Sequence, residues 1–218
     1  MEIITTADGS HTLASPYVGE HYHSKHGALQ EGQHVFIQHG VAALVSRAEI
    51  RILEMGFGTG LNALLTWRYG REQQQRISYT SIEAQPVLEE VALALNYGVL
   101  VPDAQEIFTQ LHSAPWDQVV ELTDLFSLQK WHATLEEVEL DPHFDIVYYD
   151  AFGPSYQPEL WTPPIFAKLY ASLKSGGFLV TYCAKGQVKR DLRSVGFDVT
   201  ALPGPPGKRE MTKATKLY

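Results

Sequence analysis

The fold of this chain is decided by the stretch Ile50-Arg51-Ile52-Leu53-Glu54-Met55-Gly56-Phe57-Gly58-Thr59-Gly60-Leu61-Asn62. An apolar run ends in an acid, three glycines follow at every second position, and a helical pattern begins at once. Glycine lets a ligand approach the backbone and tolerates positive φ, and the first N–H groups of a helix have no partner within it. The stretch therefore predicts a buried strand, a tight turn and a helix N-terminus that bind a nucleotide-type ligand; a purely structural corner is the alternative.

Strand and helix patterns alternate downstream of this stretch, which predicts βαβ units and a parallel sheet. We expect strands over residues 50–55, 77–83, 128–135, 144–150, 178–184, 197–202 and 209–217, and helices over 60–69, 86–97, 163–173 and 187–195. Gly70 and Ser175-Gly176-Gly177 are expected to end helices. Residues 98–126 are expected to form an irregular insertion of short helices and turns.

Residues 1–48 form a distinct N-terminal extension, which we expect to pack on the same domain as residues 49–218. Asp8-Gly9 between two short apolar runs predicts a hairpin. The aromatic and histidine-rich segment 17–24 is expected to line a pocket, and residues 41–45 are expected to be helical. Histidines 21, 23 and 26 match no zinc spacing, so we expect no metal.

Composition predicts a soluble, cytoplasmic protein of one domain. The chain has 218 residues, 44% of them hydrophobic, and no apolar run long enough to span a membrane. The start of the sequence lacks a signal-peptide pattern, and a single cysteine cannot form an intrachain disulfide. The net charge of −8 is uneven: residues 179–218 hold eight Lys and Arg against three Asp and Glu, and residues 1–178 hold nine against 22. The basic end could contact a polyanion or be an ordinary solvated surface.

Acids at the ends of three strands, Glu54, Glu83 and Asp150, mark the candidate site, because open α/β sheets bind ligands at the carboxyl ends of their strands. Glu83 lies 23 residues after Gly60, the spacing at which an acid binds the hydroxyls of a ribose. The G-x-G-x-G pattern and two C-terminal strands favour a seven-stranded, Rossmann-like fold that uses S-adenosylmethionine. An NAD(P)-dependent oxidoreductase is the alternative.

Asp150-Ala151-Phe152-Gly153-Pro154 follows the strand that ends at the candidate reaction centre. Methyl transfer to an amine requires an unprotonated nitrogen pointed at the methyl group. A carboxylate at Asp150 could orient the amine and accept its proton. Capping of the turn is the alternative role for Asp150.

Three segments of the chain resemble the methyltransferase domain of the MnmC-type tRNA wobble-uridine enzymes. They are residues 54–62, residues 149–154 with Pro158-Glu159-Leu160-Trp161, and Gly207-Lys208-Arg209-Glu210-Met211. The resemblance implies N-methylation of 5-aminomethyl-(2-thio)uridine at position 34, in the anticodon stem-loop of tRNA. Bifunctional members carry an oxidase domain that makes the amine, whereas this chain resembles the free-standing members, so a separate enzyme is expected to supply the amine.

The resemblance also implies roles for individual residues. The expected contacts to S-adenosylmethionine are Glu54, Gly56, Phe57, Gly58, Gly60, Asn62, Glu83 and Ala84, and the expected catalytic residue is Asp150. The expected substrate contacts are Tyr22, Phe152, Gly153, Pro154, Lys185, Lys208 and Arg209. Further candidates for phosphate contacts are Lys189, Arg190, Arg193, Lys213 and Lys216.

The adenine end of the cofactor site departs from the family pattern. Family members often carry an Asp after the third strand, where this chain has Trp131-His132-Ala133-Thr134-Leu135-Glu136-Glu137. Glu136 or Glu137 is expected to take its place. A methyltransferase for a small-molecule amine and a non-catalytic binding module are the remaining alternatives.

Overall fold

The computed structural model describes residues 1–15, 19–44 and 47–218. Tyr17 and Val18 of the expected pocket-lining segment, and Val45 of the expected helix, lie outside the described residues.

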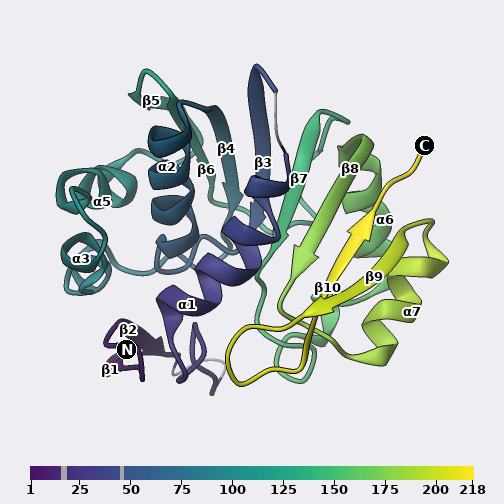
Figure 1. The fold of residues 1–218 in the computed structure, drawn as a ribbon, viewed down its shortest axis with the longest axis horizontal. Coiled ribbons are helices and arrows are strands. Elements are labelled where there is room, and N and C mark those ends of the chain that lie inside the picture. The colour runs from purple at the N-terminus through teal and green to yellow at the C-terminus, as the bar shows by residue number, and fades with distance from the viewer. Residues whose placement is uncertain (16–18, 45–46) are drawn as a thin grey trace.

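An eight-stranded sheet forms the centre of the molecule (Figure 1). Its strands, in spatial order, are β5 (Val119–Thr123), β6 (Phe126–Trp131), β4 (Arg76–Ile82), β3 (Glu49–Met55), β7 (Phe144–Tyr149), β8 (Leu173–Thr181), β10 (Glu210–Thr215) and β9 (Asp198–Pro203). β6, β4, β3, β7 and β8 pair in parallel, whereas β10 is antiparallel to both of its neighbours. The predicted Rossmann-like sheet is confirmed, with β5 added as an antiparallel edge strand.

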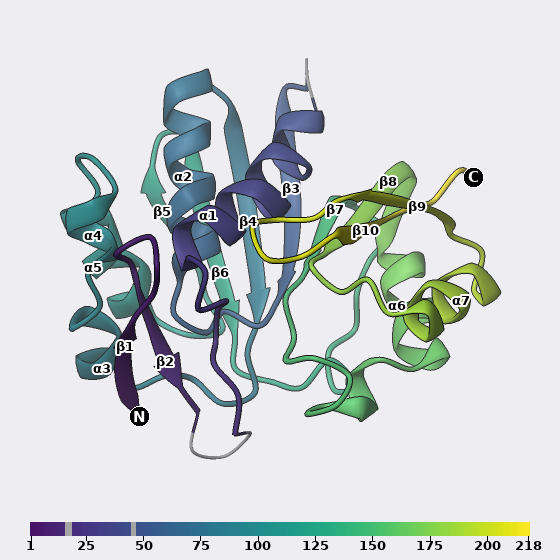
Figure 2. The same cartoon turned by 60° about the horizontal axis from the view of Figure 1, so that its bottom comes forward.

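Helices cover both faces of the sheet because successive strand residues point to opposite sides. Ile52 contributes to the core on one face and Leu53 to the core on the other. The first face is covered by α1 (Ala28–Gly32), the π-helix η1 (Gln33–Gln38), α2 (Leu61–Gln73), α3 (Glu89–Leu93), α4 (Tyr97–Leu100) and α5 (Gln105–Ser113). The second face is covered by α6 (Pro163–Ser172) and α7 (Gly186–Ser194), and Figure 2 shows the two layers. Two short 3₁₀ turns, η2 (Val41–Ala43) and η3 (Pro158–Leu160), complete the described helices.

The segment at residues 98–126, expected to be an insertion of short helices and turns, is more regular than that. It contains helix α5 and strand β5, and α5 buries Ile107, Phe108 and Leu111 against the first face. The helix expected over residues 86–97 is divided into α3 and α4.

Two glycine signals that were expected to end helices have other roles. Helix α2 continues past Gly70 to Gln73 because Gly70 packs closely on β4, where an added Cβ would lie 2.9 Å from Cδ1 of Ile77. Helix α6 ends at Ser172, so that Ser175-Gly176-Gly177 already lies in β8.

The N-terminal extension shares the core of the first face. The expected hairpin is confirmed as β1 (Glu2–Thr5) and β2 (His11–Ala14), which pair antiparallel. Helix α1 then approaches α2 so closely at Gly32 that an added Cβ would lie 2.9 Å from Cδ1 of Leu65. The extension is therefore packed directly against the helix that follows the glycine turn.

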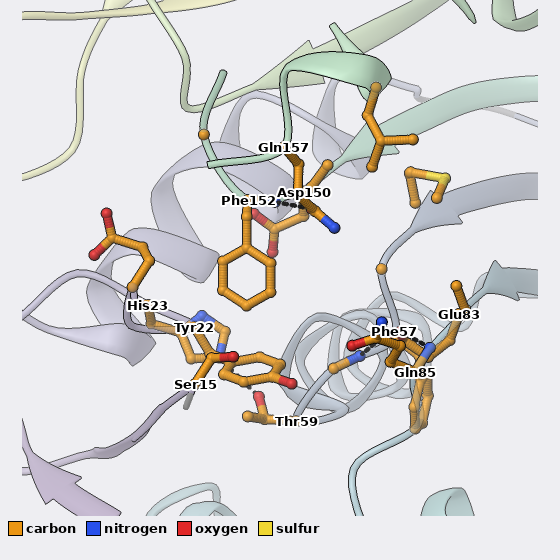
Figure 3. Close-up of a pocket in the computed structure, with 18 of the residues that line it drawn as sticks. Ser15, Tyr22, His23, Phe57, Thr59, Glu83, Gln85, Asp150, Phe152 and Gln157 are labelled. Atoms are coloured by element: carbon orange, nitrogen blue, oxygen red, sulfur yellow. Dashed lines mark hydrogen bonds between the residues drawn. The ribbon is translucent and has the colours of Figure 1, made fainter. Parts of the chain in front are cut away.

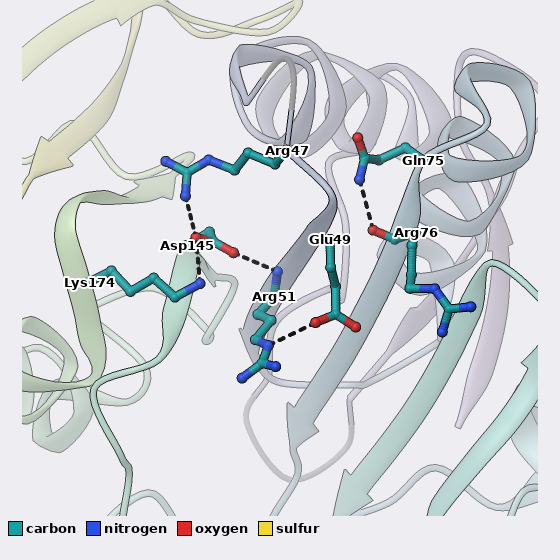
Figure 4. Close-up of polar contacts among 7 residues, drawn as sticks. All are labelled: Arg47, Glu49, Arg51, Gln75, Arg76, Asp145 and Lys174. Atoms are coloured by element: carbon teal, nitrogen blue, oxygen red, sulfur yellow. Dashed lines mark hydrogen bonds and ion pairs between the residues drawn. The ribbon is translucent and has the colours of Figure 1, made fainter.

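A buried carboxylate joins β7 to its neighbours at the end of the sheet where the parallel strands begin. Oδ1 of Asp145 accepts hydrogen bonds from Nη1 of Arg47 (2.5 Å) and Nζ of Lys174 (2.9 Å). Its Oδ2 accepts the backbone N–H of Arg51 (2.8 Å). Figure 4 shows Asp145 between these donors. Because Asp145 is fully buried, its charge depends on these partners.

Candidate active site

A cavity of about 670 Å³ opens where β3, β4 and β7 end, and the three predicted strand-end segments meet around it. Apolar side chains, among them Met55, Phe57, Ile82 and Leu135, form part of its wall. Among the described residues, the lining also includes one lysine, Lys208, and the carboxylates of Glu20, Glu31, Glu83, Glu136, Asp150 and Glu159. Its size and mixed lining are typical of small-molecule sites, and its excess of acids suits a cationic ligand.

The glycine turn at the floor of this cavity has the geometry that its sequence predicts. Gly56, Gly58 and Gly60 all have positive φ, at 91°, 50° and 71°. An added Cβ at Gly56 would lie 3.3 Å from the backbone oxygen of Asp150, and one at Gly58 would lie 3.1 Å from Tyr22. A side chain at either position would therefore crowd the space between the turn and the cavity.

Glu83 is fixed at the cavity by two backbone groups. Its Oε2 accepts the N–H of Gly58 (3.0 Å) and its Oε1 accepts the N–H of Gln85 (2.8 Å). Each carboxylate oxygen keeps a further lone pair, so that Glu83 can still accept hydrogen bonds from the two hydroxyls of a ribose. Ala84 lines the cavity beside it.

Two of the expected cofactor contacts, Glu54 and Gly60, do not reach the cavity wall. Glu54 is fully buried behind the turn, where its Oε2 accepts the hydroxyl of Ser81 (2.7 Å). Burial raises the pKa of Glu54 to about 8. Gly60 precedes α2, and an added Cβ would lie 2.8 Å from Nε2 of His112. Both residues pack behind the turn, on the side away from the cavity. The side chain of Glu54 points from β3 into the protein interior, and Gly60 faces His112 at the start of α2.

Asp150 follows β7 and is held in place by two contacts. Nδ2 of Asn62 donates to its Oδ2 (2.7 Å), and its own N–H donates to the backbone oxygen of Met55 (3.2 Å). The pKa of Asp150 is raised to about 8, by burial first and by the charge of Glu31 second, although the Asn62 hydrogen bond and the charge of Lys208 act to lower it. A proton affinity near neutral pH is suited to general acid–base chemistry.

Aromatic residues flank Asp150 on the side facing the N-terminal extension. In the view of Figure 3, Tyr22 lies below the Phe152 ring, Asp150 lies above this ring, and Glu83 lies to the right of all three. The two ring centroids are 5.0 Å apart at an interplanar angle of 72°. His23, next to Tyr22, has its Nε2 2.7 Å from Oγ1 of Thr59 in the turn. Burial lowers the pKa of His23 to about 4, so its ring is neutral at physiological pH.

A second cavity of about 610 Å³ adjoins the first. Gly153, Tyr182 and Lys208 line both. The expected substrate contacts Pro154, Lys185 and Arg209 line only the second cavity. Three cationic side chains therefore lie next to the acidic main cavity.

The other five candidates for phosphate contacts line neither cavity. The three cations of α7 have nearby partners: Lys189 pairs with Glu210, Arg190 donates to Gln187, and Arg193 donates to the backbone oxygen of Val199. The two cations near the C-terminus also have partners. Lys213 lies over the Phe178 ring, and Lys216 donates to the backbone oxygens of Tyr170 and Leu173. The charge asymmetry of the sequence therefore overstates the number of cations that face the cavities, because many of them bind neighbouring parts of α7 and the C-terminal strands.

At the expected adenine end, Glu136 lines the cavity and Glu137 does not. The Oε2 of Glu137 accepts the N–H (2.8 Å) and the hydroxyl (2.9 Å) of Thr134, which holds it within its own turn. Of the two acids expected to replace the missing Asp, only Glu136 is placed to contact a ligand.

Sequence reasoning missed three residues that shape the site. Glu31 reaches the main cavity from α1, and Gln157 accepts the N–H of Phe152 (3.1 Å). Lys130 is buried beneath the turn, where Nζ donates to the backbone oxygens of Leu111 and His112 (2.9 Å each). An amphipathic pattern could have placed Glu31 on a helix, but nothing local indicates that this acid faces inward.

The residues at the cavity fit S-adenosylmethionine. Glu83 offers the ribose acceptors, the glycine turn permits close approach, and the apolar wall is suited to adenine. Over residues 1–15, 19–44 and 47–218, no group of three or more His, Cys, Asp or Glu side chains could hold a metal ion. In the same residues, no helix is long and apolar enough to cross a membrane.

Comparison with protein families identifies residues 99–217 as matching a family described as S-adenosyl-L-methionine-dependent methyltransferase. The chain is 34% identical to the tRNA 5-methylaminomethyl-2-thiouridine biosynthesis bifunctional protein MnmC of Cupriavidus necator, over 92% of this chain and 32% of that one. It is equally identical to the same protein of Cupriavidus metallidurans, over 98% of this chain and 33% of that one. The chain thus spans about a third of the length of these relatives.

A solved structure agrees with these relatives. The crystal structure of MNMC2 from Aquifex aeolicus superposes with a TM-score of 0.82 and 30% identity, covering 99% of this chain and 70% of that one. These findings do not favour the NAD(P)-dependent oxidoreductase that the sequence left open.

Proposed function

We propose that the substrate of this chain is the 5-aminomethyl group of uridine or 2-thiouridine at the wobble position of tRNA. The chain belongs to the family of S-adenosyl-L-methionine-dependent methyltransferases. The product is the 5-methylaminomethyl form. The names of the MnmC relatives support this substrate.

One observation carries the proposal: Asp150 faces the same cavity as the glycine turn and Glu83. The cofactor supplies an electrophilic methyl group, and the acceptor must supply a nitrogen lone pair. Asp150 hydrogen-bonds the substrate amine, orients its lone pair and accepts its proton. The surrounding carboxylates favour a cationic amine over a neutral acceptor.

The other residues that line the cavity have separate roles in binding the cofactor and the substrate. Gly56, Phe57, Gly58 and Ala84 contact the cofactor, Glu83 binds its ribose and Glu136 meets the adenine amine. Asn62 holds Asp150. Tyr22, Phe152 and Gly153 enclose the uracil ring, because aromatic rings stack on bases that leave the anticodon loop.

The second cavity receives the tRNA backbone next to the wobble nucleotide. Lys185, Lys208 and Arg209 line it and can neutralise phosphates. Pro154 forms part of its wall. The negative charge of the whole chain makes this local patch the determinant of RNA binding.

The substrate amine is not created by methyl transfer. An earlier activity must install the 5-aminomethyl group on uridine, and a separate enzyme is our proposal for it. A tRNA substrate also places the reaction in the cytoplasm.

Incubation with labelled S-adenosylmethionine and tRNA bearing 5-aminomethyluridine, followed by nucleoside analysis, tests the proposal. We expect label in 5-methylaminomethyluridine and none in tRNA that lacks the amine. Transfer to small amines with equal efficiency, and no tRNA dependence, would instead indicate a small-molecule amine methyltransferase. Binding of NAD in place of S-adenosylhomocysteine would also overturn the assignment of S-adenosylmethionine as the cofactor.

A further inference from the structure

Glu31 extends from helix α1 to the main cavity, although its side chain is only 10% exposed. Its Oε2 accepts the N–H of Ser24 (2.9 Å), and its Oε1 accepts Nζ of Lys208 (2.6 Å). Lys208 comes from the loop between β9 and β10, so the carboxylate is held from two separate segments. Such a side chain is preorganised rather than free to turn toward solvent.

The packing of α1 on α2 brings Gly32, the residue after Glu31, close to the residue that holds Asp150. An added Cβ at Gly32 would lie 3.2 Å from Oδ1 of Asn62, and Nδ2 of Asn62 donates to Asp150. In the described part of the chain, the buried Oδ1 of Asn62 has no hydrogen-bond partner. Glu31, Asp150 and Asn62 thus line one cavity, with two carboxylates and an amide oxygen that lacks a partner among the described residues.

The charges of Glu31 and Asp150 also act on each other. After burial, the charge of Glu31 is the largest cause that raises the pKa of Asp150, and Lys208 acts in the opposite direction. An ammonium group carries one positive charge and three N–H donors. Its charge and donors match the acceptors gathered here, because Lys208 is the one lysine or arginine among the described residues that line the main cavity.

We propose that Glu31 is a second substrate-binding carboxylate, which acts with Asp150 to hold the ammonium form of the substrate's 5-aminomethyl group. Asp150 then accepts one ammonium proton: the N–H bond breaks, an O–H bond forms on Asp150, and the nitrogen keeps the electron pair. Glu31 stays hydrogen-bonded to Ser24 and Lys208 throughout. The inference rests on the proposed function, because it assumes an amine substrate.

Calorimetric binding of two free nucleosides tests the inference in the presence of S-adenosylhomocysteine. 5-Aminomethyluridine carries the ammonium group, and 5-methyluridine lacks it. We expect the wild-type chain to prefer the first, and Glu31→Gln to reduce that preference about tenfold, since a bond to a charged group is worth one to a few kcal/mol. Glu72→Gln, which removes an exposed carboxylate from its pair with Arg68, is expected to change nothing.

The outcomes separate the two proposals. A wild-type preference that survives Glu31→Gln overturns the role of Glu31 and leaves the proposed function standing. No preference in the wild-type chain overturns both. If Glu31→Gln does not fold, Lys208→Met serves instead. It is expected to raise the preference, because loss of the Lys208 charge leaves the charge of Glu31 uncompensated toward the ammonium group, and an unchanged preference overturns the inference. Free nucleosides carry no phosphate, so any contact of Lys208 with tRNA does not affect this ratio.

Discussion

Asn62 connects the helix that follows the glycine turn to the end of β7, because its Nδ2 donates a 2.7 Å hydrogen bond to Oδ2 of Asp150. The contact joins residues 88 positions apart. It places a carboxylate of raised pKa beside the floor of the proposed cofactor site. This hydrogen bond therefore connects the helix after the glycine turn to the proposed proton acceptor.

Replacement of Asp150 by Asn tests the proposed proton acceptor. We expect Asp150→Asn to reduce methyl transfer by about 100-fold to 10,000-fold, the usual contribution of a general base. Binding of S-adenosylhomocysteine should persist, because Asp150 contacts the amine. Rates are measured with labelled cofactor and binding by calorimetry. Wild-type turnover in the variant would show that Asp150 only supports the turn.

Replacement of Glu83 tests the ribose contact. We expect Glu83→Ala to weaken S-adenosylhomocysteine binding roughly 10-fold to 100-fold, because hydrogen bonds to a charged group are lost. Glu137→Ala is the matched control, since Glu137 bonds only within its own turn in the described contacts. Calorimetry compares the two variants. Equal dissociation constants for both would place the ribose elsewhere.

Removal of the cations in the second cavity tests the RNA contact. Each phosphate contact contributes about one to the slope of log affinity against log salt. We therefore expect Lys185→Ala combined with Arg209→Ala to reduce that slope for tRNA by about two. The control removes two cations from α2, Arg68 and Arg71, which pair with Glu72 and Asp103. Fluorescence anisotropy across a salt series measures the slopes. A similar reduction in the control variant would show that the slope depends on overall charge and not on Lys185 and Arg209.

Glu54 predicts a pH dependence of stability. Its folded-state pKa, raised from 4.5 to about 8, exceeds its unfolded value, so the folded chain retains a proton that the unfolded chain releases. The free energy of unfolding should therefore fall as pH rises between these values, by up to about 1.4 kcal/mol per pH unit. Glu54→Gln should remove this contribution and leave that of Asp150, whose pKa is raised in the same direction. Urea denaturation from pH 4.5 to pH 8 measures both slopes; identical slopes would contradict the burial of an ionisable group at Glu54.

Replacement of Asp145 is expected to lower the free energy of unfolding without removing the candidate active site. Asp145→Asn leaves Arg47 and Lys174 without their buried partner, which should cost about 3 kcal/mol in the free energy of unfolding. Glu49→Gln, which breaks the exposed pair with Arg51, should cost less than about 1 kcal/mol. Chemical denaturation compares them, and an equal cost for both would mean that burial adds nothing to the Asp145 contacts.

Much of the fold follows from local sequence patterns. The run before Glu54, the glycines of the turn and the helix after them form as their sequence predicts. Short helices were expected between residues 98 and 126, but the bounds of α5 and the presence of β5 were not predicted, because turn residues surround both elements. Gly70 was misread because its role is close packing on Ile77, which no neighbour in sequence indicates.

The sequence by itself determined the parallel sheet, the glycine turn and the acids at the strand ends, because these depend on short-range periodicity and on backbone freedom. Only the tertiary structure decided which acids face the cavity. Glu54 points behind the turn, Glu136 points in and Glu137 does not, and Glu31 arrives from a helix packed on α2 through Gly32. Side-chain direction at these positions depends on contacts between segments far apart in the chain, such as Glu31 with Lys208, 177 positions away.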